Sequence, residues 1–332
     1  MRVLVTGCAG ALGSALMPEL LRRRGHDVFG CDLTHSEDPQ VMRADVAERR
    51  QMERVFANYS PEAVFHLAGE FGRANGENYP EQLWRTNVMG TDNVMRLCEA
   101  TGATLIFASS SEAYGDISEY APATEDFKEE WLDECAPRFH NSYSLSKWVN
   151  ERQIFMTAQQ SNLKAVVLRF FNVFGPGERY SPYRSVVCQF MYRLAKGLPI
   201  TVYRESFRTH LYVEDWASTV ANVIDPAIYE RLFRWQRTWL GSGKSGVPTF
   251  NIGGKEFESA IQLLERIAKV VSPKETLSVE QIATVLDREK ANVVGKKPDC
   301  TAAMTWLDHN PRVDLDEGLR LTWAWMKQTY DL

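Results

Sequence analysis

Through the first half of the chain, short apolar runs of strand length alternate with longer segments whose apolar residues recur with helical periodicity. The predicted strands cover residues 3–5, 27–32, 41–46, 63–69, 104–108 and 164–171, and the predicted helices cover 12–21, 47–59, 80–100 and 143–160. Such strict alternation predicts an α/β fold with a doubly wound parallel sheet of the Rossmann type. Residues 70–79 are polar and predict a loop.

The pattern changes after residue 176, where proline, arginine and tyrosine become frequent. It predicts helices at 186–196, 259–271 and 315–330, strands at 200–203 and 249–253, and a strand at 208–215 that leads into a helix. Residues 235–247 are rich in Gly and Ser and predict an exposed insertion. We therefore expect a cofactor-binding domain at 1–176 and a mainly substrate-binding lobe at 177–332, with some strands returning to the main sheet and a ligand cleft between the two.

The first predicted turn carries Gly7, Gly10 and Gly13, spaced three residues apart between a strand and a helix. A glycine triplet alone is weak evidence, but this context is typical of dinucleotide binding, with the pyrophosphate at the helix N-terminus. Asp32 ends the second predicted strand, where a carboxylate accepts hydrogen bonds from the adenosine ribose and repels a 2′-phosphate. The sequence thus favours NAD over NADP.

Composition narrows the class of protein further. The chain has 332 residues and a formal net charge of −5, which gives no support to binding of nucleic acid or of an acidic membrane. Its six cysteines form no CxxC pair and show no metal-ligand spacing, as expected for reduced thiols in a cytosol. The sequence enters a strand at once and has no apolar run of membrane-spanning length, so we expect a cytoplasmic protein without a signal peptide.

Two Tyr-x-x-x-Lys pairs occur, Tyr143/Lys147 and Tyr192/Lys196, so the spacing alone is uninformative. The first pair begins a helix after the serine-rich end of a strand and can face the carboxyl edge of the sheet. The second pair lies in the predicted lobe, where a solvated helix face is expected. His66 lies within an apolar run, which indicates a packed histidine rather than a catalytic base.

The chemistry of Ser110, Tyr143 and Lys147 supports a catalytic role for the first pair. A phenol normally titrates near pH ~10, and a neighbouring ammonium together with a positively charged nicotinamide would lower the pKa of Tyr143. Tyr143 could then take a proton from a hydroxyl that loses hydride, Ser110 would bind the same oxygen, and Lys147 would also hold the nicotinamide ribose. Glu112 is either a chemical participant or a buried structural carboxylate.

The whole set of motifs resembles the extended short-chain dehydrogenase/reductases, specifically the NAD-dependent epimerase/dehydratase family that acts on nucleotide-sugars. The matching segments span nearly the whole chain: Thr6-Gly7-x-x-Gly10-x-x-Gly13, Asp32, Asp45-Val46, His66-Leu67-Ala68, Asn87-x-x-Gly90-Thr91, Ser109-Ser110-Ser111-x-x-Tyr114-Gly115, Tyr143-x-x-x-Lys147, Asn172-x-x-Gly175-Pro176, Arg208-x-x-Leu211-Tyr212-Val213-x-Asp215, Asn251-Ile252-Gly253 and Glu317-Gly318-Leu319.

The resemblance implies residue roles. The NAD site would comprise Gly7, Gly10, Ala11, Leu12, Gly13, Asp32, Asp45, Val46, Leu67, Ala68, Asn87, Tyr143 and Lys147, and the catalytic set would be Ser110, Ser111, Glu112, Tyr143 and Lys147. Substrate would be bound by Asn172, Tyr203, Arg184 and Arg208, the two arginines having donors suited to a diphosphate. Family members pair through the equivalents of helices 80–100 and 143–160, so a homodimer is expected. No metal is implied.

The resemblance also implies a reaction, in which NAD oxidises a sugar at C4 and later returns the hydride. Between these steps the 4-keto sugar is epimerised, dehydrated or, as a uronate, decarboxylated. We take a nucleoside-diphosphate-sugar epimerase as the leading hypothesis, with a UDP-uronate decarboxylase or a 4,6-dehydratase as alternatives. Ser110-Ser111-Glu112 lacks the Asp of thymidine-type dehydratases, which argues against that subclass. A catalytically idle NAD-binding sensor is the alternative of another class.

Overall fold

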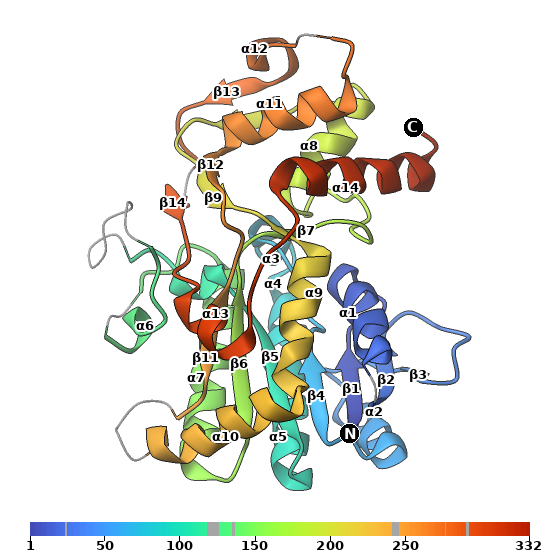
Figure 1. The fold of residues 1–332 in the computed structure, drawn as a ribbon, viewed down its shortest axis with the longest axis vertical. Helices are drawn as coiled ribbons and strands as arrows, with labels where there is room; N and C mark the ends of the chain where they lie inside the picture. The colour runs from blue at the N-terminus through green and yellow to red at the C-terminus, as the bar shows by residue number, and fades with distance from the viewer. Residues whose placement is uncertain (24, 118–125, 135–136, 241–245, 276, 290–291) are drawn as a thin grey trace.

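The computed structural model describes residues 1–23, 25–117, 126–134, 137–240, 246–275, 277–289 and 292–332. Its centre is a seven-stranded sheet, and every pair of neighbouring strands is parallel (Figure 1). Across the sheet the order is β11 (Thr249–Ile252), β6 (Ala165–Phe170), β5 (Thr104–Ser110), β4 (Ala63–His66), β1 (Arg2–Thr6), β2 (Asp27–Asp32) and β3 (Val41–Arg43). The predicted doubly wound parallel sheet is confirmed.

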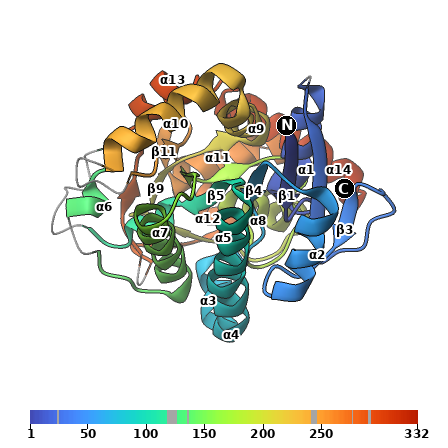
Figure 2. The same ribbon diagram turned by 90° about the horizontal axis from the view of Figure 1, so that it is seen from below.

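Helices cover both faces of this sheet, as Figure 2 shows from below. One face packs against α1 (Ala11–Arg22), α9 (Val213–Ala221), α10 (Pro226–Leu240) and α13 (Thr301–Leu307). The other face packs against α2 (Arg49–Tyr59), α5 (Gly90–Thr101) and α7 (Ser142–Gln160). Because both faces are buried, the central strands are apolar almost throughout, which is why they were visible in the sequence.

A smaller lobe stands over one end of the sheet and has a hydrophobic core of its own. Its helices are α8 (Val186–Ala195), α11 (Ala260–Val271), α12 (Val279–Ile282) and α14 (Leu315–Tyr330). Its strands form a three-stranded sheet, β12 (Phe257–Ser259), β9 (Phe207–Thr209) and β14 (Gly295–Lys296), and the pair β8 (Thr201–Tyr203) and β13 (Thr284–Leu286). A further pair, β7 (Val173–Phe174) and β10 (Leu211–Tyr212), precedes α9.

The structure corrects the sequence prediction in three segments. The predicted loop at 70–79 contains α3 (Arg73–Asn78). The predicted helix at 80–100 consists of α4 (Pro80–Leu83), a π-helical segment η1 (Trp84–Met89) and α5. Residues 235–240 of the predicted insertion continue α10, which buries Ile228 and Leu232 earlier in its length, and residues 241–245 lie outside the described residues. The sequence missed the strands β7, β12, β13 and β14 and the 15-residue helix α10. It also missed the short elements α6 (Trp131–Glu134), α12, α13, η2 (Ser111–Tyr114) and η3 (Asn222–Ile224).

Gly90 begins α5 and continues the helical segment η1, so a glycine lies inside a helical stretch. A Cβ atom at this position would lie 2.7 Å from Cγ2 of Val46. The close approach of α5 to the segment after β3 therefore offsets the cost of roughly 1 kcal/mol that glycine brings to a helix.

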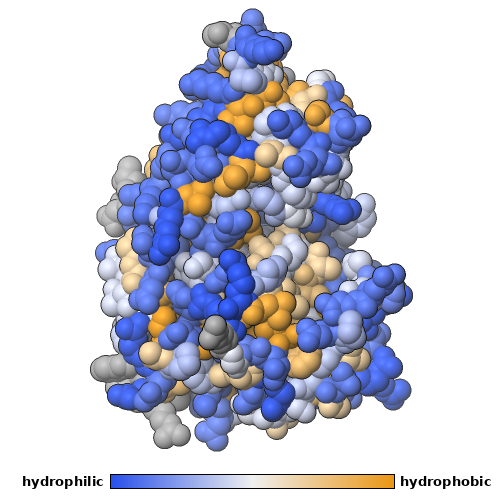
Figure 3. Space-filling model, turned by 45° about the vertical axis from the view of Figure 1, so that its right-hand side comes forward, coloured by the Kyte–Doolittle hydropathy of each residue, from blue (hydrophilic) through white to orange (hydrophobic). Residues whose placement is uncertain are grey.

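The surface shown in Figure 3 is mostly hydrophilic, with smaller hydrophobic areas in both the upper and the lower parts. Within the described residues, no helix combines the length and the apolar character needed to cross a membrane.

Candidate active site

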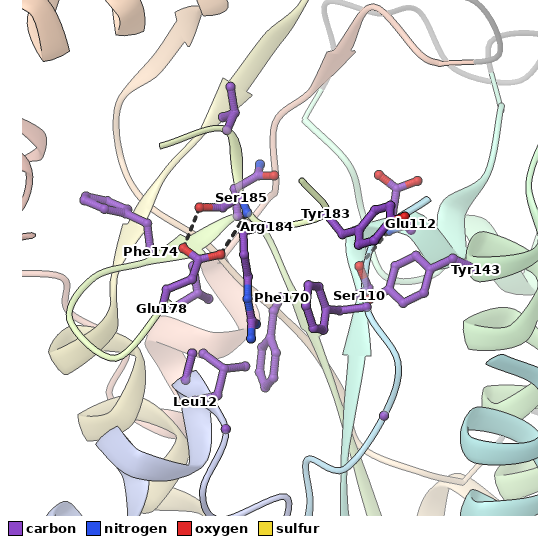
Figure 4. A pocket seen from close by; sticks show the side chains of 18 of the residues that line it. Leu12, Ser110, Glu112, Tyr143, Phe170, Phe174, Glu178, Tyr183, Arg184 and Ser185 are labelled. Atoms are coloured by element: carbon purple, nitrogen blue, oxygen red, sulfur yellow. Dashed lines mark hydrogen bonds between the residues drawn. The ribbon is translucent and has the colours of Figure 1, made fainter. Parts of the chain in front are cut away.

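One cavity of about 750 Å³ lies between the carboxyl ends of the main strands and the lobe. Its walls include the glycine turn, the ends of β2, β4 and β5, the segment 170–190 and parts of the lobe sheets. This is the place where open α/β sheets bind ligands. Figure 4 shows side chains from both parts of the molecule meeting there.

The glycine turn forms a backbone cradle at one end of this cavity. Gly7 has a positive φ of 72°, and a Cβ there would come within 2.8 Å of the Ala68 Cα. A Cβ on Gly13 would lie 2.2 Å from the Gly7 carbonyl oxygen, so α1 could not pack so close to β1 with any other residue. The predicted residues Gly10, Ala11 and Leu12 also line the cavity, and α1 begins at Ala11. The cradle therefore fits a dinucleotide pyrophosphate.

Asp32 lies at the end of β2, beside this cradle. Its carboxylate accepts hydrogen bonds from the backbone N–H groups of Ala9, at 3.0 Å, and Thr34, at 2.9 Å. These contacts fix the carboxylate and leave lone pairs for ribose hydroxyls. Asp45, Val46, Leu67 and Ala68 line the cavity as well.

Asn87 lies behind the cavity wall. Its side-chain amide oxygen accepts from the Glu70 N–H at 2.7 Å, and its amide nitrogen donates to the Glu70 carbonyl at 3.0 Å and to the Ser146 hydroxyl at 3.3 Å. Asn87 is therefore placed to fix the loop after β4 and the start of α7, so a cofactor contact by this residue stays a prediction.

Ser110 and Tyr143 meet inside the cavity (Figure 4). Ser110 ends β5 and Tyr143 lies in the first turn of α7, so their side chains face each other across the cavity wall. Burial raises the pKa of Tyr143 to about 12, although the neighbouring Ser110 hydroxyl opposes this. The lowering expected from Lys147 and the positively charged nicotinamide acting together stays a prediction, and the Nζ of Lys147 lies 5.9 Å from the ring centroid.

Lys147 lies one helical turn beyond Tyr143 and is 9 % exposed. Its Nζ donates to the Ala108 carbonyl at 2.8 Å. Burial lowers the pKa of Lys147 to about 8, and the negative charge of Glu151 one turn further along α7 opposes that shift. The ammonium is therefore held just behind the cavity wall, beside Gly69, which lines the cavity.

Glu112 occupies the wall next to Ser110 and Ser111, both of which line the cavity. One carboxylate oxygen lies 2.7 Å from Nζ of Lys296, and the other accepts a hydrogen bond from the Ser144 hydroxyl at 2.9 Å. Burial raises the pKa of Glu112, but Lys296 together with Arg73 and Arg208 outweighs burial and lowers it to about 2. Glu112 is a fixed anion, so it has no proton to donate at neutral pH.

Lys296 belongs to a cluster of three cations around Glu112, the other two being Arg73 and Arg208. Arg73 pairs with Glu289 at 3.1 Å, so three cations and two carboxylates meet around Glu112 and leave one net positive charge there. Glu258, on the strand next to Arg208, pairs with Arg266 and is not counted in this cluster. Lys296 is 2 % exposed. Such a buried excess of positive charge calls for an anionic ligand.

Arg208 was expected to donate hydrogen bonds to a diphosphate, but most of its donors are already used within the chain. Its Nη1 donates to the carbonyls of Phe207 and Val294, and its Nη2 donates to the Asn292 side chain and the Val293 carbonyl. Among the described residues, Nε is the one guanidinium nitrogen of Arg208 without a hydrogen-bond partner, so the predicted diphosphate contact would use this group and the fixed charge rather than a bidentate fork.

The remaining predicted substrate residues also line the cavity. Asn172 donates to the Thr209 carbonyl at 3.0 Å and so joins the end of β6 to the lobe. Arg184 stacks over Phe71 at 4.0 Å from the ring centroid, and Figure 4 shows it extending toward Leu12. Tyr203 ends β8 on the lobe side.

The second Tyr-x-x-x-Lys pair lies elsewhere. The sequence predicted a solvated helix face for Tyr192, and this prediction is wrong. The Tyr192 ring stacks on Tyr180 at 3.9 Å between ring centroids and meets Tyr330 edge-on. Lys196 is exposed. His66 is a packed histidine as predicted, held between Thr6 and Thr91 at 2.8 and 3.1 Å, and burial lowers its pKa to about 3.

Sequence reasoning missed several residues of the site, namely Arg73, Glu178, Tyr183, Glu258, Glu289 and Lys296. Lys296 stands next to Lys297 in a polar segment, and nothing in its spacing distinguishes the two. A buried lysine is recognised only when the strand that carries it is known.

The glycine cradle, the acid at the end of β2 and the serine and tyrosine that line the cavity beside a buried lysine define an NAD-dependent enzyme of the Rossmann class. The sequence model of the NAD dependent epimerase/dehydratase family matches residues 3–227 of this chain. The chain belongs to the NAD-dependent epimerase/dehydratase family, and its cofactor is NAD.

Similar proteins cover almost the whole chain. The UDP-N-acetyl-alpha-D-glucosaminuronate decarboxylase of Bacillus cytotoxicus is 24% identical over 98% of both chains. UDP-glucuronic acid decarboxylase 6 of Arabidopsis thaliana is 28% identical over 97% of this chain and 87% of its own. The structure of Thermus thermophilus UDP-glucose 4-epimerase in complex with NAD superimposes with a TM-score of 0.78, at 26% identity over 98% of this chain and 99% of that chain.

The two tyrosine–lysine pairs make opposite predictions. Tyr143→Phe should lower kcat by about 10²- to 10⁴-fold, because the proton acceptor is lost, while NAD binding and the melting temperature persist. Tyr192→Phe keeps its ring contacts and should retain kcat. Rate measurements with NAD titrations on both variants check this, and equal kcat values for the two would contradict the assignment of Tyr143.

Proposed function

We propose that the protein decarboxylates a uridine-diphosphate hexuronate through transient oxidation at C4. The observation that carries the proposal is the buried Lys296–Glu112 pair in its cation cluster, next to Ser110 and Tyr143. A hexuronate carboxylate bound there would neutralise the excess positive charge. Two relatives that match almost the full chain are named as uronate decarboxylases, which supports the same substrate class.

NAD would accept the hydride that leaves C4 in the oxidation and, as NADH, would donate it back in the later reduction. Tyr143 accepts the proton of the C4 hydroxyl, and Ser110 hydrogen-bonds the same oxygen. The resulting 4-keto uronate is a β-keto acid, so the electrons of the C5–C6 bond can move toward the C4 oxygen as carbon dioxide leaves. Ser110 and Tyr143 then stabilise the enolate oxygen, C5 is protonated, and the ketone is reduced.

The positions of the charges favour this order of events. Lys147 behind the wall stabilises negative charge on Tyr143 in its phenolate form. Glu112 is ionised, so it cannot act as the acid that a dehydratase needs to expel a hydroxyl group. The presence of Ser110 and Tyr143 together in the cavity argues against an idle sensor, which would need only the glycine turn and Asp32.

Epimerisation at C4, the leading hypothesis from sequence, remains the second candidate. It requires the same ketone and the same three residues, but the sugar must turn over before hydride returns. The likeness to the Thermus thermophilus 4-epimerase favours this alternative.

The mass of the product separates the two reactions. With UDP-glucuronate, we expect loss of carbon dioxide and no net accumulation of NADH, read by chromatography with mass spectrometry. An unchanged mass with a new retention time would favour epimerisation, and stoichiometric NADH would exclude both. UDP-glucose is the matched neutral substrate, and it should not be turned over.

Lys296 should determine binding of the substrate carboxylate. Lys296→Met should raise the KM for UDP-glucuronate by about 10- to 100-fold, the loss expected for a charge-assisted contact. Burial lowers the pKa of Lys296 to about 8, against the effect of Glu112, so KM should rise as pH increases above 8. Lys296→Arg stays charged and should abolish this rise, and Lys297→Met, at a half-exposed position, should leave KM unchanged.

A homodimer formed through α5 and α7 is also proposed. Among the apolar residues of the two predicted helices 80–100 and 143–160, Leu97 and Phe155 are buried within the chain, whereas Trp84, Val88 and Trp148 are only half-buried.

Met89 at the end of η1 and Met156 on α7 add exposed apolar surface, with 58 % and 47 % of the residue exposed. Sedimentation should show a dimer that Met89→Lys weakens and that Met304→Lys on α13 does not affect. A monomer at all concentrations would contradict the proposal.

A further inference from the structure

The three-stranded sheet of the lobe carries a row of ionisable residues across its strands. Arg208 on β9 is the direct partner of Glu258 on β12 and of Lys296 on β14 (Figure 1). Directly opposed residues of neighbouring strands project to the same face of a sheet. Arg208 lines the cavity and Lys296 contacts Glu112, so this face is the one turned toward the cavity.

Glu258 at the end of this row lines the cavity and is 6 % exposed. Both of its carboxylate oxygens are buried, and neither makes a hydrogen bond with any residue that the structure describes. Buried carboxylate oxygens in folded proteins ordinarily have donors, and one carboxylate can accept about four hydrogen bonds. Glu258 thus has acceptor capacity that only a ligand or water can fill.

Arg266 on α11 gives Glu258 an ion pair but does not satisfy it. Its Nε lies 3.1 Å from one oxygen of Glu258, while its other nitrogens pair with Glu256 at 2.9 Å and Asp316 at 3.2 Å. One guanidinium therefore serves three carboxylates. Burial raises the pKa of Glu258 to about 7, and Arg266 opposes that rise.

The row relates Glu258 to a definite part of the substrate. Neighbouring strands are about 4.8 Å apart, so the positions of Lys296 and Glu258 are separated by roughly 10 Å with Arg208 midway. Under the proposed function, the sugar carboxylate lies at Lys296 and the diphosphate near Arg208. The ribose follows the diphosphate in any nucleoside-diphosphate sugar, and it would lie at Glu258.

We propose that Glu258 accepts hydrogen bonds from the ribose hydroxyls of the substrate nucleotide, so that the enzyme selects ribonucleotide over 2′-deoxyribonucleotide sugars. The inference rests on the proposed function for the placement of sugar and diphosphate. The recognition is the same chemistry that places a carboxylate on the adenosine ribose of NAD. It uses the two hydroxyl donors to satisfy the open acceptors of a buried carboxylate.

Calorimetric titration of the NAD-loaded enzyme with UDP and with 2′-deoxy-UDP tests this. The deoxy compound should bind about 10- to 100-fold more weakly, as expected when a hydrogen bond to a charged group is lost. Glu258→Gln should weaken UDP binding and bring the two affinities close together. Equal affinities in the unmodified enzyme, or an unchanged ratio in Glu258→Gln, would overturn the inference.

Glu256→Gln is the matched control, because Glu256 also pairs with Arg266 but does not line the cavity. This variant should keep the full ratio, and a fallen ratio would show that the Arg266 cluster rather than Glu258 reads the ribose. The same pair of titrations with GDP and 2′-deoxy-GDP tests whether the preference for ribose is independent of the base.

The binding assay involves no sugar chemistry, so the two proposals fail separately. A ribose preference without loss of carbon dioxide from UDP-glucuronate leaves the inference standing and removes the proposed reaction. If neither nucleoside diphosphate binds, the inference is overturned together with the substrate class.

Discussion

The active-site helix α7 is tied to the sheet by a buried ion pair between Glu151 and Arg169. These side chains are 0 % and 2 % exposed, and their closest approach is 2.8 Å. Glu151 also accepts from the Ser109 hydroxyl at 2.5 Å, and Arg169 donates to the Tyr114 hydroxyl at 3.0 Å. Loss of one partner of such a pair costs about 3–5 kcal/mol, because the other charge stays buried alone. The relative positions of Ser110, Tyr143 and Lys147 depend on this contact.

The charges of the site are divided between the two parts of the molecule. The Rossmann part contributes Asp32, the backbone of the glycine turn and the Ser110–Tyr143 pair, whereas the lobe contributes Arg208 and Lys296. Under the proposed function, the backbone donors of the glycine turn would bind the cofactor, and the lobe supplies the positive charges of Arg208 and Lys296. Because Arg73 and Glu112 also belong to the Rossmann part, both parts set the charge that an anionic group of the substrate would meet, whereas Ser110 and Tyr143 come from the Rossmann part alone.

The sequence predicted what depends on local pattern. The bounds of β2 and the position of the glycine turn were predicted because buried parallel strands and tight turns leave continuous signals. The role of Lys296 could not be predicted, since its neighbours Glu112 and Arg208 come from distant segments. The burial that raises the pKa of Tyr143 could not be predicted for a related reason, because the extent of burial is a property of the assembled cavity.

The order of strands in the main sheet affects how the chain folds during synthesis and which fragments of it can fold. Strand β11 pairs with β6, and nearly all of the lobe's first elements lie between them in the sequence. A nascent chain that has passed Phe170 therefore exposes an unpaired strand edge until Ile252 has emerged from the ribosome. Asn251 is also the acceptor for the buried Tyr114 hydroxyl, at 2.9 Å. A fragment cut after the cofactor motifs would keep every glycine of the turn and still lack one edge of its sheet.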